Sequence, residues 1–207
     1  MGITLFCDVF TERNAFDVEQ SRKIFGTAQS LGFGIKAHVD QFTNLGGSSM
    51  AIEIGAISVD HLDVISEEEV GALAASETVG VVIPTENFNA GKIRFSPARR
   101  LIDAGCAVAI STDYNPGSAP CPSQPMAMAI AARYQKLQPA ETFVAATINA
   151  AFAIGEGHRV GSIEENKTAD LLIFETTDYR EIVYEFGVSP SVTVIKKGEV
   201  VYDNKRS

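Results

Sequence analysis

The feature that most constrains the fold is an alternation of short apolar segments with amphipathic segments along the first 113 residues. The apolar segments are rich in β-branched residues, and most are followed by residues with helical spacing. Apolar strands that alternate with amphipathic helices predict a parallel sheet covered by helices. The predicted strands are residues 3–10, 33–40, 57–62, 78–84 and 106–112.

Capping and stop signals place helices between and after these strands. Ser66, with Glu69 three residues later, forms the capping-box pattern that opens a helix. Ser96 and Pro97 suit the N-cap and the first position of a later helix. The predicted helices are residues 17–32, part of 46–56, 67–76, 97–104, 124–137 and 139–155.

The predicted strand ends recur at a regular interval. Phe10, His38, His61, Pro84 and Asp113 follow one another at spacings of 28, 23, 23 and 29 residues. A TIM-type (β/α) barrel has units of roughly 31 residues, so five units fit this segment. Doubly wound sheets have similar repeats, and the spacing alone favours a barrel only weakly. We therefore predict an α/β fold that forms part of a barrel.

The sequence after residue 155 has a different pattern. Residues 160–176 and 191–204 are typical of strand–turn–strand segments, and "KKG" in the second suits a hairpin turn. We predict two domains, a barrel portion over residues 1–155 and a small β-sandwich portion over residues 156–207.

The composition argues against several classes of protein. A net charge of −9 disfavours sequence-independent DNA binding, which relies on Lys and Arg. No apolar run approaches the roughly 20 residues that cross a bilayer. Asp8 interrupts the apolar start of the chain, so no signal peptide is predicted. Cys7, Cys106 and Cys121 fit neither a metal pattern nor a disulfide framework, and we expect reduced cysteines in a cytoplasmic protein.

Three side chains suited to metal or proton chemistry lie at predicted strand ends. His38 and His61 end two strands and Asp113 ends a third, and catalytic residues of barrels gather at this edge. His and Asp are ligand types that suit Zn²⁺ or Fe²⁺. Each residue alone could instead be a polar cap on a strand, and His158 lies outside the pattern. A hydrolytic metal site needs three or more protein ligands, and the chain contains no H-x-H pair.

Two loops follow these strand ends. Gly46 and Gly47, after the second strand, permit a close backbone approach or a positive φ. Asn115, Gly117 and Ser118, after the fifth strand, offer an amide, an accessible N–H and a hydroxyl that could hold a carboxylate or an amide. Each loop could equally be an ordinary connection built from turn-forming residues.

Several segments together resemble the imidazolonepropionase family of metal-dependent amidohydrolases. The segments "KAHVDQF", "LGGSSMAIEIGAISVDHLD" and "AVAISTDYNPGS" are similar to that family's strand ends and loops. The segments "LQPAETFVAATINAAFAIG" and "VGSIEENKTADLLIFET" look like the superfamily's closing helix and its return to a small β-sandwich. The resemblance implies that the chain corresponds to the C-terminal half of these proteins, about strands 4–8 of the barrel.

The resemblance also implies roles for particular residues. His38 and Asp113 would bind one divalent metal ion, zinc or iron. His61 would lie beside the water and the scissile carbonyl, and Asp113 would be the general base. Gln41 would contact the imidazolone ring at a position where the family carries Glu or Gln. The substrate would also be bound by Asn115, Gly117 and Ser118.

The reaction implied by the resemblance is hydrolysis of the ring C–N bond of 4-imidazolone-5-propanoate to N-formimidoyl-L-glutamate, in histidine degradation. Two alternatives stay open. One is another amidohydrolase, such as a deaminase or a dihydroorotase-like enzyme, and the other is a non-catalytic half that needs a partner chain. Proteins of the family are much longer, carry an H-x-H pair upstream and are expected to form homo-oligomers. We therefore expect this chain to be inactive by itself, with its partners limited to a small molecule and a missing N-terminal half.

Overall fold

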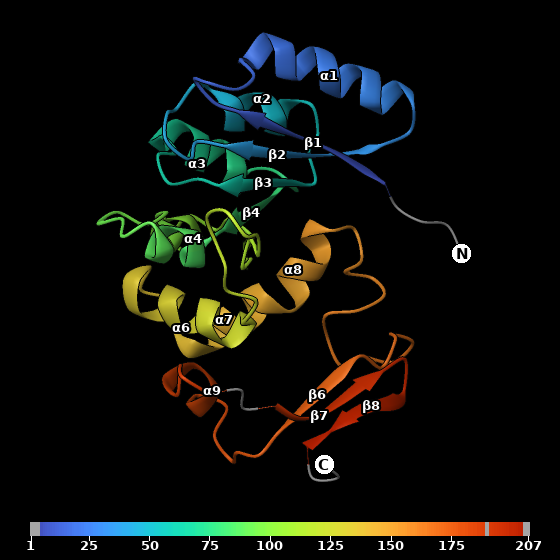
Figure 1. The fold of residues 1–207 in the computed structure, drawn as a ribbon. Helices are drawn as coiled ribbons and strands as arrows, with labels where there is room; N and C mark the ends of the chain where they lie inside the picture. Colours follow the sequence, from blue (N-terminus) through green and yellow to red (C-terminus); the bar gives the residue numbers. More distant parts are fainter. Residues whose placement is uncertain (1–4, 189–190, 205–207) are drawn as a thin grey trace.

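The computed structural model describes residues 5–188 and 191–204, and its main element is a five-stranded parallel sheet (Figure 1). The strands follow the apolar segments because a sheet that is covered by other elements must bury its side chains. They are β1 (Phe6–Thr11), β2 (Gly34–Val39), β3 (Ser58–His61), β4 (Val79–Val82) and β5 (Val108–Ile110). All five predicted strands are confirmed, although residues 3 and 4 of the first prediction lie outside the described residues.

The order of the strands across the sheet is the same as their order in the chain. Every neighbouring pair from β1 to β5 is parallel. A doubly wound sheet would instead reverse its direction at a switch point and place an early strand in the middle. Consecutive units of a (β/α) barrel have the sequential order seen here. The predicted α/β fold with a partial barrel is therefore confirmed. The strand order distinguishes the barrel from a doubly wound sheet, which the spacing of the strand ends could not do.

The main hydrophobic core lies between one face of the sheet, called here the outer face, and the helices. Val9, Ile35 and Val59 point to this face and pack in one cluster with Phe25 and Leu73 of two different helices. Their spacing follows the alternation of side chains along a strand. The helices of this part of the chain are α1 (Val18–Ser30), α2 (Gly47–Glu53), α3 (Glu67–Ala74), α4 (Pro84–Asn89), α5 (Ala98–Asp103), α6 (Gln124–Tyr134), α7 (Pro139–Ala146) and α8 (Ile148–Ala153).

The opposite face of the sheet, called here the inner face, carries both apolar and polar side chains. Val81 and Ala109 pack with Ala153 of α8 in a second, smaller cluster. Lys36 and Asp60 line a cavity of about 460 Å³ that α8 borders. In a closed barrel this face points to the interior, where side chains from successive strands meet.

The C-terminal region forms a separate antiparallel sheet at the opposite end of the molecule from α1 (Figure 1). Its elements are β6 (Leu171–Phe174), α9 (Glu181–Tyr184), β7 (Ser191–Lys196) and β8 (Glu199–Asp203). The β7–β8 hairpin confirms the prediction for residues 191–204. The prediction for residues 160–176 is wrong in part, because only β6 forms there and backbone turns occupy the residues before it.

Of two predicted helix starts, one differs from the structure and one agrees with it. The helix expected from Ser96 begins at Ala98, with Pro97 as the N-cap. The hydroxyl of Ser96 is buried and bonded to Nε2 of Gln135 at 2.6 Å, so it does not cap the helix. The capping box of Ser66 and Glu69 is confirmed, since each side chain bonds the other residue's backbone N–H.

The long helix predicted over residues 139–155 is divided into α7 and α8 at Thr147. The Thr147 backbone leaves the helical region, with φ −122° and ψ −90°. Its hydroxyl donates to the carbonyl of Phe143 at 2.6 Å, four residues earlier. A hydroxyl bonded in this way competes with the helical backbone and bends or interrupts the helix.

Two further properties concern the environment of the chain. None of the helices in the described ranges is both long and apolar enough to cross a membrane. Cys7, Cys106 and Cys121 are free thiols. The cytoplasmic location stays a prediction.

Candidate active site

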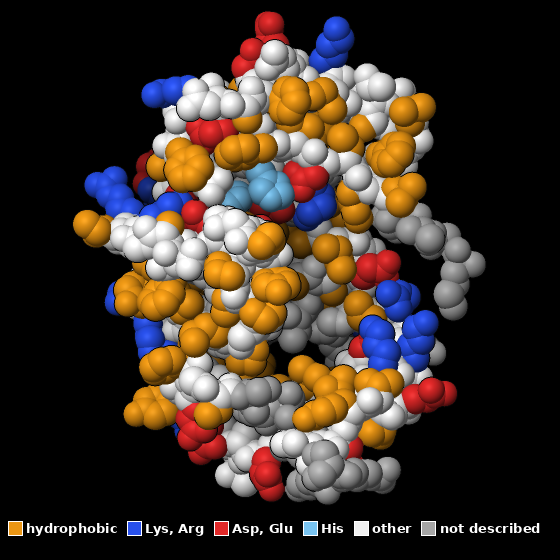
Figure 2. Space-filling model, in the orientation of Figure 1, with side chains coloured by type: hydrophobic (Ala, Val, Ile, Leu, Met, Phe, Trp, Pro, Cys, Tyr) orange, Lys and Arg blue, Asp and Glu red, His pale blue; other side chains and the backbone are white. Residues whose placement is uncertain are grey.

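Two histidines from neighbouring strands meet at the C-terminal ends of the sheet. His38 lies in β2 and His61 ends β3, and their ring centroids are 5.2 Å apart with planes inclined by 55°. Asp113 follows β5, and its charge acts on the ring of His38. Figure 2 shows histidine side chains beside acidic and basic side chains on one face of the molecule. The structure places the two histidine rings side by side, and the charge of Asp113 reaches His38. The chemical roles of the three residues stay predictions.

The backbone at these strand ends leaves the extended conformation. Asp40, His61 and Asp113 have φ values of 53°, 83° and 49°. In a straight strand, Asp60 and His61 would point to opposite faces of the sheet. The turn at His61 allows its ring to lie beside that of His38. A non-glycine residue in this region costs about 1–3 kcal/mol, and such strain is concentrated at active sites.

The two histidines differ in protonation. His61 is only 4% exposed, and burial, together with the positive charges of His38 and Lys92, lowers its pKa to about 3. Burial also acts to lower the pKa of His38, but the hydrogen bond and charge of Asp8, together with the charges of Asp60 and Asp113, outweigh it and raise that pKa. Within the described part of the chain, Nδ1 of His61 is buried without a hydrogen-bond partner. His61 is therefore a neutral ring with a polar atom available to a ligand.

Asp113 is the carboxylate at this edge of the sheet. Burial raises its pKa, the charge of His38 opposes the rise, and the charges of Glu86 and Asp60 add to it. The Asp113 backbone N–H donates to the hydroxyl of Ser111 at 3.1 Å. A carboxylate whose pKa is shifted towards neutrality is suited to accept and return a proton.

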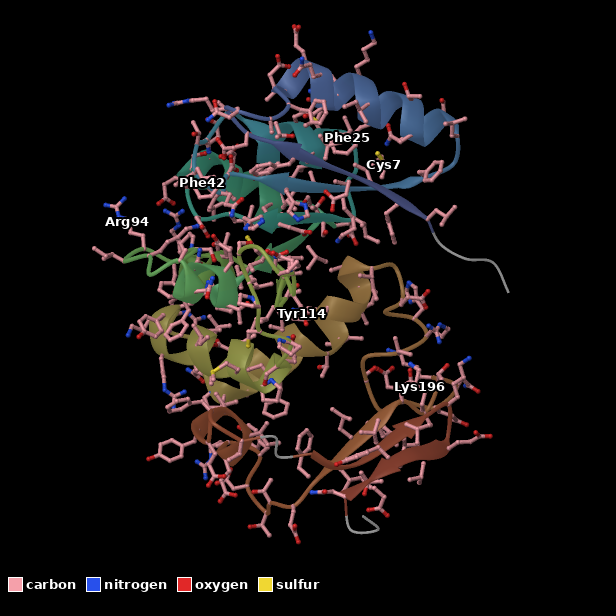
Figure 3. All side chains as sticks on the ribbon, in the orientation of Figure 1. Cys7, Phe25, Phe42, Arg94, Tyr114 and Lys196 are labelled. Atoms are coloured by element: carbon pink, nitrogen blue, oxygen red, sulfur yellow. The ribbon has the colours of Figure 1, made fainter. Side chains whose placement is uncertain are left out.

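The loop after Asp113 is tied together by Asn115. Its side-chain Oδ1 accepts the backbone N–H groups of Gly117 and Ser118, both at 2.8 Å. Its Nδ2 donates to the Asp113 carbonyl at 2.7 Å, which fixes the loop to the strand end. Figure 3 shows Tyr114 on this loop. The N–H of Gly117, expected to be accessible, is therefore bonded inside the loop.

The loop after β2 carries Gln41, which is half-buried. Its neighbours Phe42 and Thr43 donate their backbone N–H groups to Oε2 of Glu12, at 3.0 and 3.1 Å. Figure 3 shows Phe42 at the edge of the molecule on this loop. Glu12 follows β1, so a single carboxylate holds the Gln41 loop against the neighbouring strand end.

A polar network on the inner face was not predicted. Asp8 Oδ1 lies 2.9 Å from His38 Nδ1, and Lys36 Nζ lies 3.7 Å from Asp60 Oδ2. Ser58 donates its hydroxyl to Asp60 at 2.8 Å. One ligand atom each from Asp8, His38 and Asp60 lie within 4.8 Å of one another. The spacing of two between Lys36 and His38, and between Ser58 and Asp60, is the signal that could have placed them on one face.

A second ionic cluster borders the site and was also missed. Lys92 Nζ lies 2.9 Å from both Asp63 Oδ2 and Glu86 Oε2. The amide of Asn87 donates to the same two carboxylates at 2.8 and 3.0 Å. The ammonium group also lies 4.8 Å above the ring of Phe42. The cluster joins the loop after β3 and helix α4 to the loop that carries Gln41.

Comparisons with known proteins agree with this geometry. Residues 12–201 match the family model described as "Amidohydrolase family". The chain is 55% identical to an imidazolonepropionase from Chloroflexus aggregans, over 99% of this chain and 48% of that protein. An imidazolonepropionase from Herpetosiphon aurantiacus is 52% identical, over 97% of this chain and 47% of that protein. The chain therefore spans about half the length of the curated relatives it matches.

Solved structures support the same fold. An adenosine deaminase from Xanthomonas campestris with bound zinc superposes with a TM-score of 0.79 and 21% identity, over 92% of this chain and 50% of that chain. At such low identity the likeness concerns the fold alone. The resemblance of the sequence to imidazolonepropionases is confirmed by the relatives at 55% and 52% identity.

Proposed function

The chain belongs to the amidohydrolase family, and we propose that it is the C-terminal half of an imidazolonepropionase. In this proposal the complete enzyme hydrolyses the ring C–N bond of 4-imidazolone-5-propanoate and releases N-formimidoyl-L-glutamate. The observation that carries the proposal is the 55% identity to an imidazolonepropionase over 99% of the chain. The site supports it, because side chains suited to hydrolysis, His38, His61 and Asp113, lie at the C-terminal ends of one parallel sheet.

The donor set fits one divalent metal ion. His38 bonds Asp8 through Nδ1, which leaves Nε2 for a metal, and Asp113 offers a carboxylate. Nitrogen and carboxylate donors suit zinc and iron, and the adenosine deaminase of similar fold contains zinc. Such a site needs a third ligand, which in this proposal lies in the half of the family fold that the chain does not span. When bound, the metal lowers the pKa of water towards neutrality and polarises a carbonyl.

The residues of this chain then have distinct roles. Asp113 accepts the proton of the attacking water and returns it to the ring nitrogen as the C–N bond breaks. Burial keeps His61 neutral, with a pKa of about 3, so it orients the water or the carbonyl oxygen through a hydrogen bond. Gln41 contacts the imidazolone ring, and because an amide cannot take up a proton at neutral pH, the base role falls to Asp113.

The loop after β5 completes the proposed substrate site. Asn115, Gly117 and Ser118 bind the substrate in this proposal. The exposed positions of Gly117 and Ser118 agree with this role. In the free loop their polar groups bond one another. Substrate binding therefore exchanges some of these hydrogen bonds for bonds to the ligand, and the loop keeps its register through the bond from Asn115 to Asp113.

The proposal includes the larger organisation of the enzyme. Residues 1–155 form the barrel portion and residues 156–207 the small β-sandwich portion, and the antiparallel sheet of β6, β7 and β8 supports this division. The N-terminal half of the family fold supplies the rest of the barrel. The complete enzyme is a cytoplasmic homo-oligomer that acts on a small molecule.

A chimera tests the function. The N-terminal half of the Chloroflexus aggregans relative is fused to this chain, loaded with zinc or iron(II), and assayed for loss of imidazolonepropionate and formation of N-formimidoyl-L-glutamate. We expect turnover by the chimera and none by the isolated chain. Asp113→Asn should reduce the rate of the chimera by at least about 100-fold, because it removes the general base. Asp103→Asn, at an exposed acid on α5, is the matched control and should keep the full rate.

Two outcomes would contradict the proposal. A folded chimera with bound metal that leaves imidazolonepropionate intact, but deaminates cytosine or adenosine, would identify an amidohydrolase of different specificity. Turnover that survives Asp113→Asn would remove Asp113 from the proposed mechanism.

A further inference from the structure

We infer that Asp8 is a positioning residue for His38. Its carboxylate holds the imidazole with the proton on Nδ1 and so presents the lone pair of Nε2 to the metal. The inference deepens the proposed function and rests on it in one respect, the role of His38 as a metal ligand. Asp8 was considered from the sequence only as an acid inside an apolar segment, and its contact with His38 is a finding of the structure.

The register of the sheet brings the two residues together. In the parallel pairing of β1 with β2, Asp8 lies beside Lys36, and Phe10 lies beside His38. Asp8 and His38 are therefore diagonal neighbours that point to the same face. Asp8 Oδ1 lies 2.9 Å from His38 Nδ1, and the side chains are 36% and 31% exposed. An ionised carboxylate only accepts hydrogen bonds, so the proton of this bond belongs to Nδ1.

A second acid on the inner face near His38, Asp60, is already engaged elsewhere. Asp60 lies opposite His38 in the pairing of β2 with β3. Its carboxylate accepts a hydrogen bond from the hydroxyl of Ser58 at 2.8 Å and lies 3.7 Å from the ammonium group of Lys36. Lys36 in turn donates to Ser58 and, at 3.1 Å, to the carbonyl of Ala153. The network therefore leaves Asp8 as the acid that bonds the imidazole.

The tautomer matters because a metal binds only the unprotonated nitrogen of a neutral imidazole. Free histidine in water favours the form with the proton on Nε2, which would block the nitrogen that faces away from Asp8. The hydrogen bond made by one ring nitrogen decides which nitrogen keeps the proton. A carboxylate behind a metal-binding histidine also raises the basicity of the ligand, and loss of such a partner weakens metal binding by about 10–100-fold.

The tautomer can be measured directly by ¹⁵N NMR on the metal-free chain. The chain contains three histidines, so the variants His61→Asn and His158→Gln assign the ring signals. At alkaline pH we expect His38 of the wild-type chain to show a protonated Nδ1 and an unprotonated Nε2. In Asp8→Ala the proton should move to Nε2. Asp103→Asn is the matched control, since its exposed acid pairs with Arg99, and it should leave the His38 pattern unchanged.

The inference is overturned by a wild-type His38 that carries its proton on Nε2, or by a folded Asp8→Ala chain that keeps the proton on Nδ1. The wild-type measurement decides the question even if Asp8→Ala fails to fold, which a backbone amide spectrum would show. A purely structural role for Asp8 would change stability and leave the tautomer of the folded chain as it was.

Zinc binding gives a second readout that needs no substrate. Competition with a chromophoric chelator should show about 10–100-fold weaker zinc binding for Asp8→Ala in the chimera, and no change for Asp103→Asn. The two proposals fail separately. A chimera that does not hydrolyse imidazolonepropionate contradicts the proposed function, whereas equal zinc affinity in wild type and Asp8→Ala contradicts the role of Asp8.

Discussion

Two buried side chains at the candidate site change their protonation in opposite directions on folding. Burial, with the charges of His38 and Lys92, lowers the pKa of His61 from 6.5 to about 3. Burial outweighs the hydrogen bond from Ser48 and raises the pKa of Asp40 from 3.8 to about 7. Between pH 3.8 and 6.5, the unfolded chain binds a proton at His61 that the folded chain does not. Over the same range, the folded chain binds a proton at Asp40 that the unfolded chain does not.

These opposed effects predict how stability depends on pH. As pH falls through this range, His61 destabilises the fold and Asp40 stabilises it. Relative to wild type, the free energy of unfolding of His61→Asn should therefore rise as pH falls from 6.5 to 3.8, by up to about 1.4 kcal/mol per pH unit. That of Asp40→Asn should fall by a similar amount. Denaturant unfolding at several pH values measures both slopes.

Asparagine is a suitable replacement at both positions, because it tolerates the positive φ that they share. The double variant is the control, since the two changes should cancel and restore the wild-type slope. Equal slopes for the wild type and both single variants would contradict the assigned protonation states.

The Lys92 cluster predicts a large effect from a single side chain. Asp63 and Glu86 are 7% and 4% exposed, and Lys92 Nζ lies 2.9 Å from each. Lys92→Met leaves two buried carboxylates without their cation, which should lower the free energy of unfolding by about 3 kcal/mol. Lys196→Met is the matched control, because Lys196 pairs with Asp170 at the surface and should contribute at most about 1 kcal/mol. Thermal unfolding that ranks the two variants equally would contradict this assignment.

At the residue scale, the position of a residue along its strand predicted the location of the candidate site better than its residue type did. The strand ends predicted that His38, His61 and Asp113 lie at one edge of the sheet. They could not predict the positive φ of His61, since that conformation depends on the packing around a buried ring. Asp8 was missed because its partner is 30 residues away and becomes a neighbour only through the register of β1 with β2.

At the scale of elements, the Gly46–Gly47 pair joins β2 to α2. Gly46 has a φ of 80°, and a Cβ on Gly47 would lie 2.8 Å from Cγ1 of Val39. Both properties that the sequence left open, a positive φ and a close approach, are therefore present. The pair allows α2 to begin directly against the end of the strand that carries His38.

Two alanine substitutions at glycines should act in opposite directions. Gly47→Ala places a methyl group against buried Val39 and should lower the free energy of unfolding by about 1–3 kcal/mol. Gly26→Ala lies in the exposed interior of α1, where, apart from the helix backbone around it, no atom of the described residues lies within 4 Å of the added methyl. This change should raise the free energy of unfolding by about 0.5–1 kcal/mol. Denaturant unfolding compares the two. Stabilisation by Gly47→Ala would show that the approach of α2 to β2 is looser than described.

Short sequence motifs predicted the start of a helix where the interacting residues are close together in the sequence. The capping box of Ser66 and Glu69 sets the start of α3 with residues three apart, and the prediction is confirmed. The sequence did not predict the break at Thr147, and it predicted the start of α5 wrongly. Both depend on a hydroxyl group, which has several possible hydrogen-bond partners. The hydroxyl of Thr147 bonds a carbonyl within its own helix, and the hydroxyl of Ser96 bonds Gln135 in another part of the chain.

At the scale of the whole molecule, the sheet is open at both edges within residues 5–188 and 191–204. There β1 pairs with β2 alone, and β5 pairs with β4 alone. Beside β1 lies an apolar groove of about 450 Å³, and Figure 3 shows Cys7 and Phe25 between β1 and α1. The groove is lined by Phe6, Cys7, Ile24, Thr27, Ala28, Leu31 and Phe33. The spacing of strand ends predicted consecutive barrel units, but pairing across an edge depends on strands that this sheet does not contain.

An open edge beside an apolar groove predicts that the isolated chain associates with itself, since unpaired strand edges pair with other chains. Leu31 is 69% exposed and lines the groove, while Ile93 is 99% exposed and lies outside it. Leu31→Arg should therefore shift the chain towards monomer in sedimentation velocity at matched concentrations. Ile93→Arg adds the same charge and removes a similar apolar side chain, so it should leave the association unchanged.

The chimera with the relative's N-terminal half separates the β1 edge from other surfaces. If preceding barrel strands cover β1 within one chain, association through this edge should disappear in the chimera without any substitution. Leu31→Arg should then lower the stability of the chimera, because Leu31 would be buried there, whereas in the isolated chain it lies at the surface. Association that persists equally in the chimera and in Leu31→Arg would place the contact on another face. The same charge would thus weaken assembly in one context and folding in the other, a pair of effects that a surface unrelated to barrel closure would not produce.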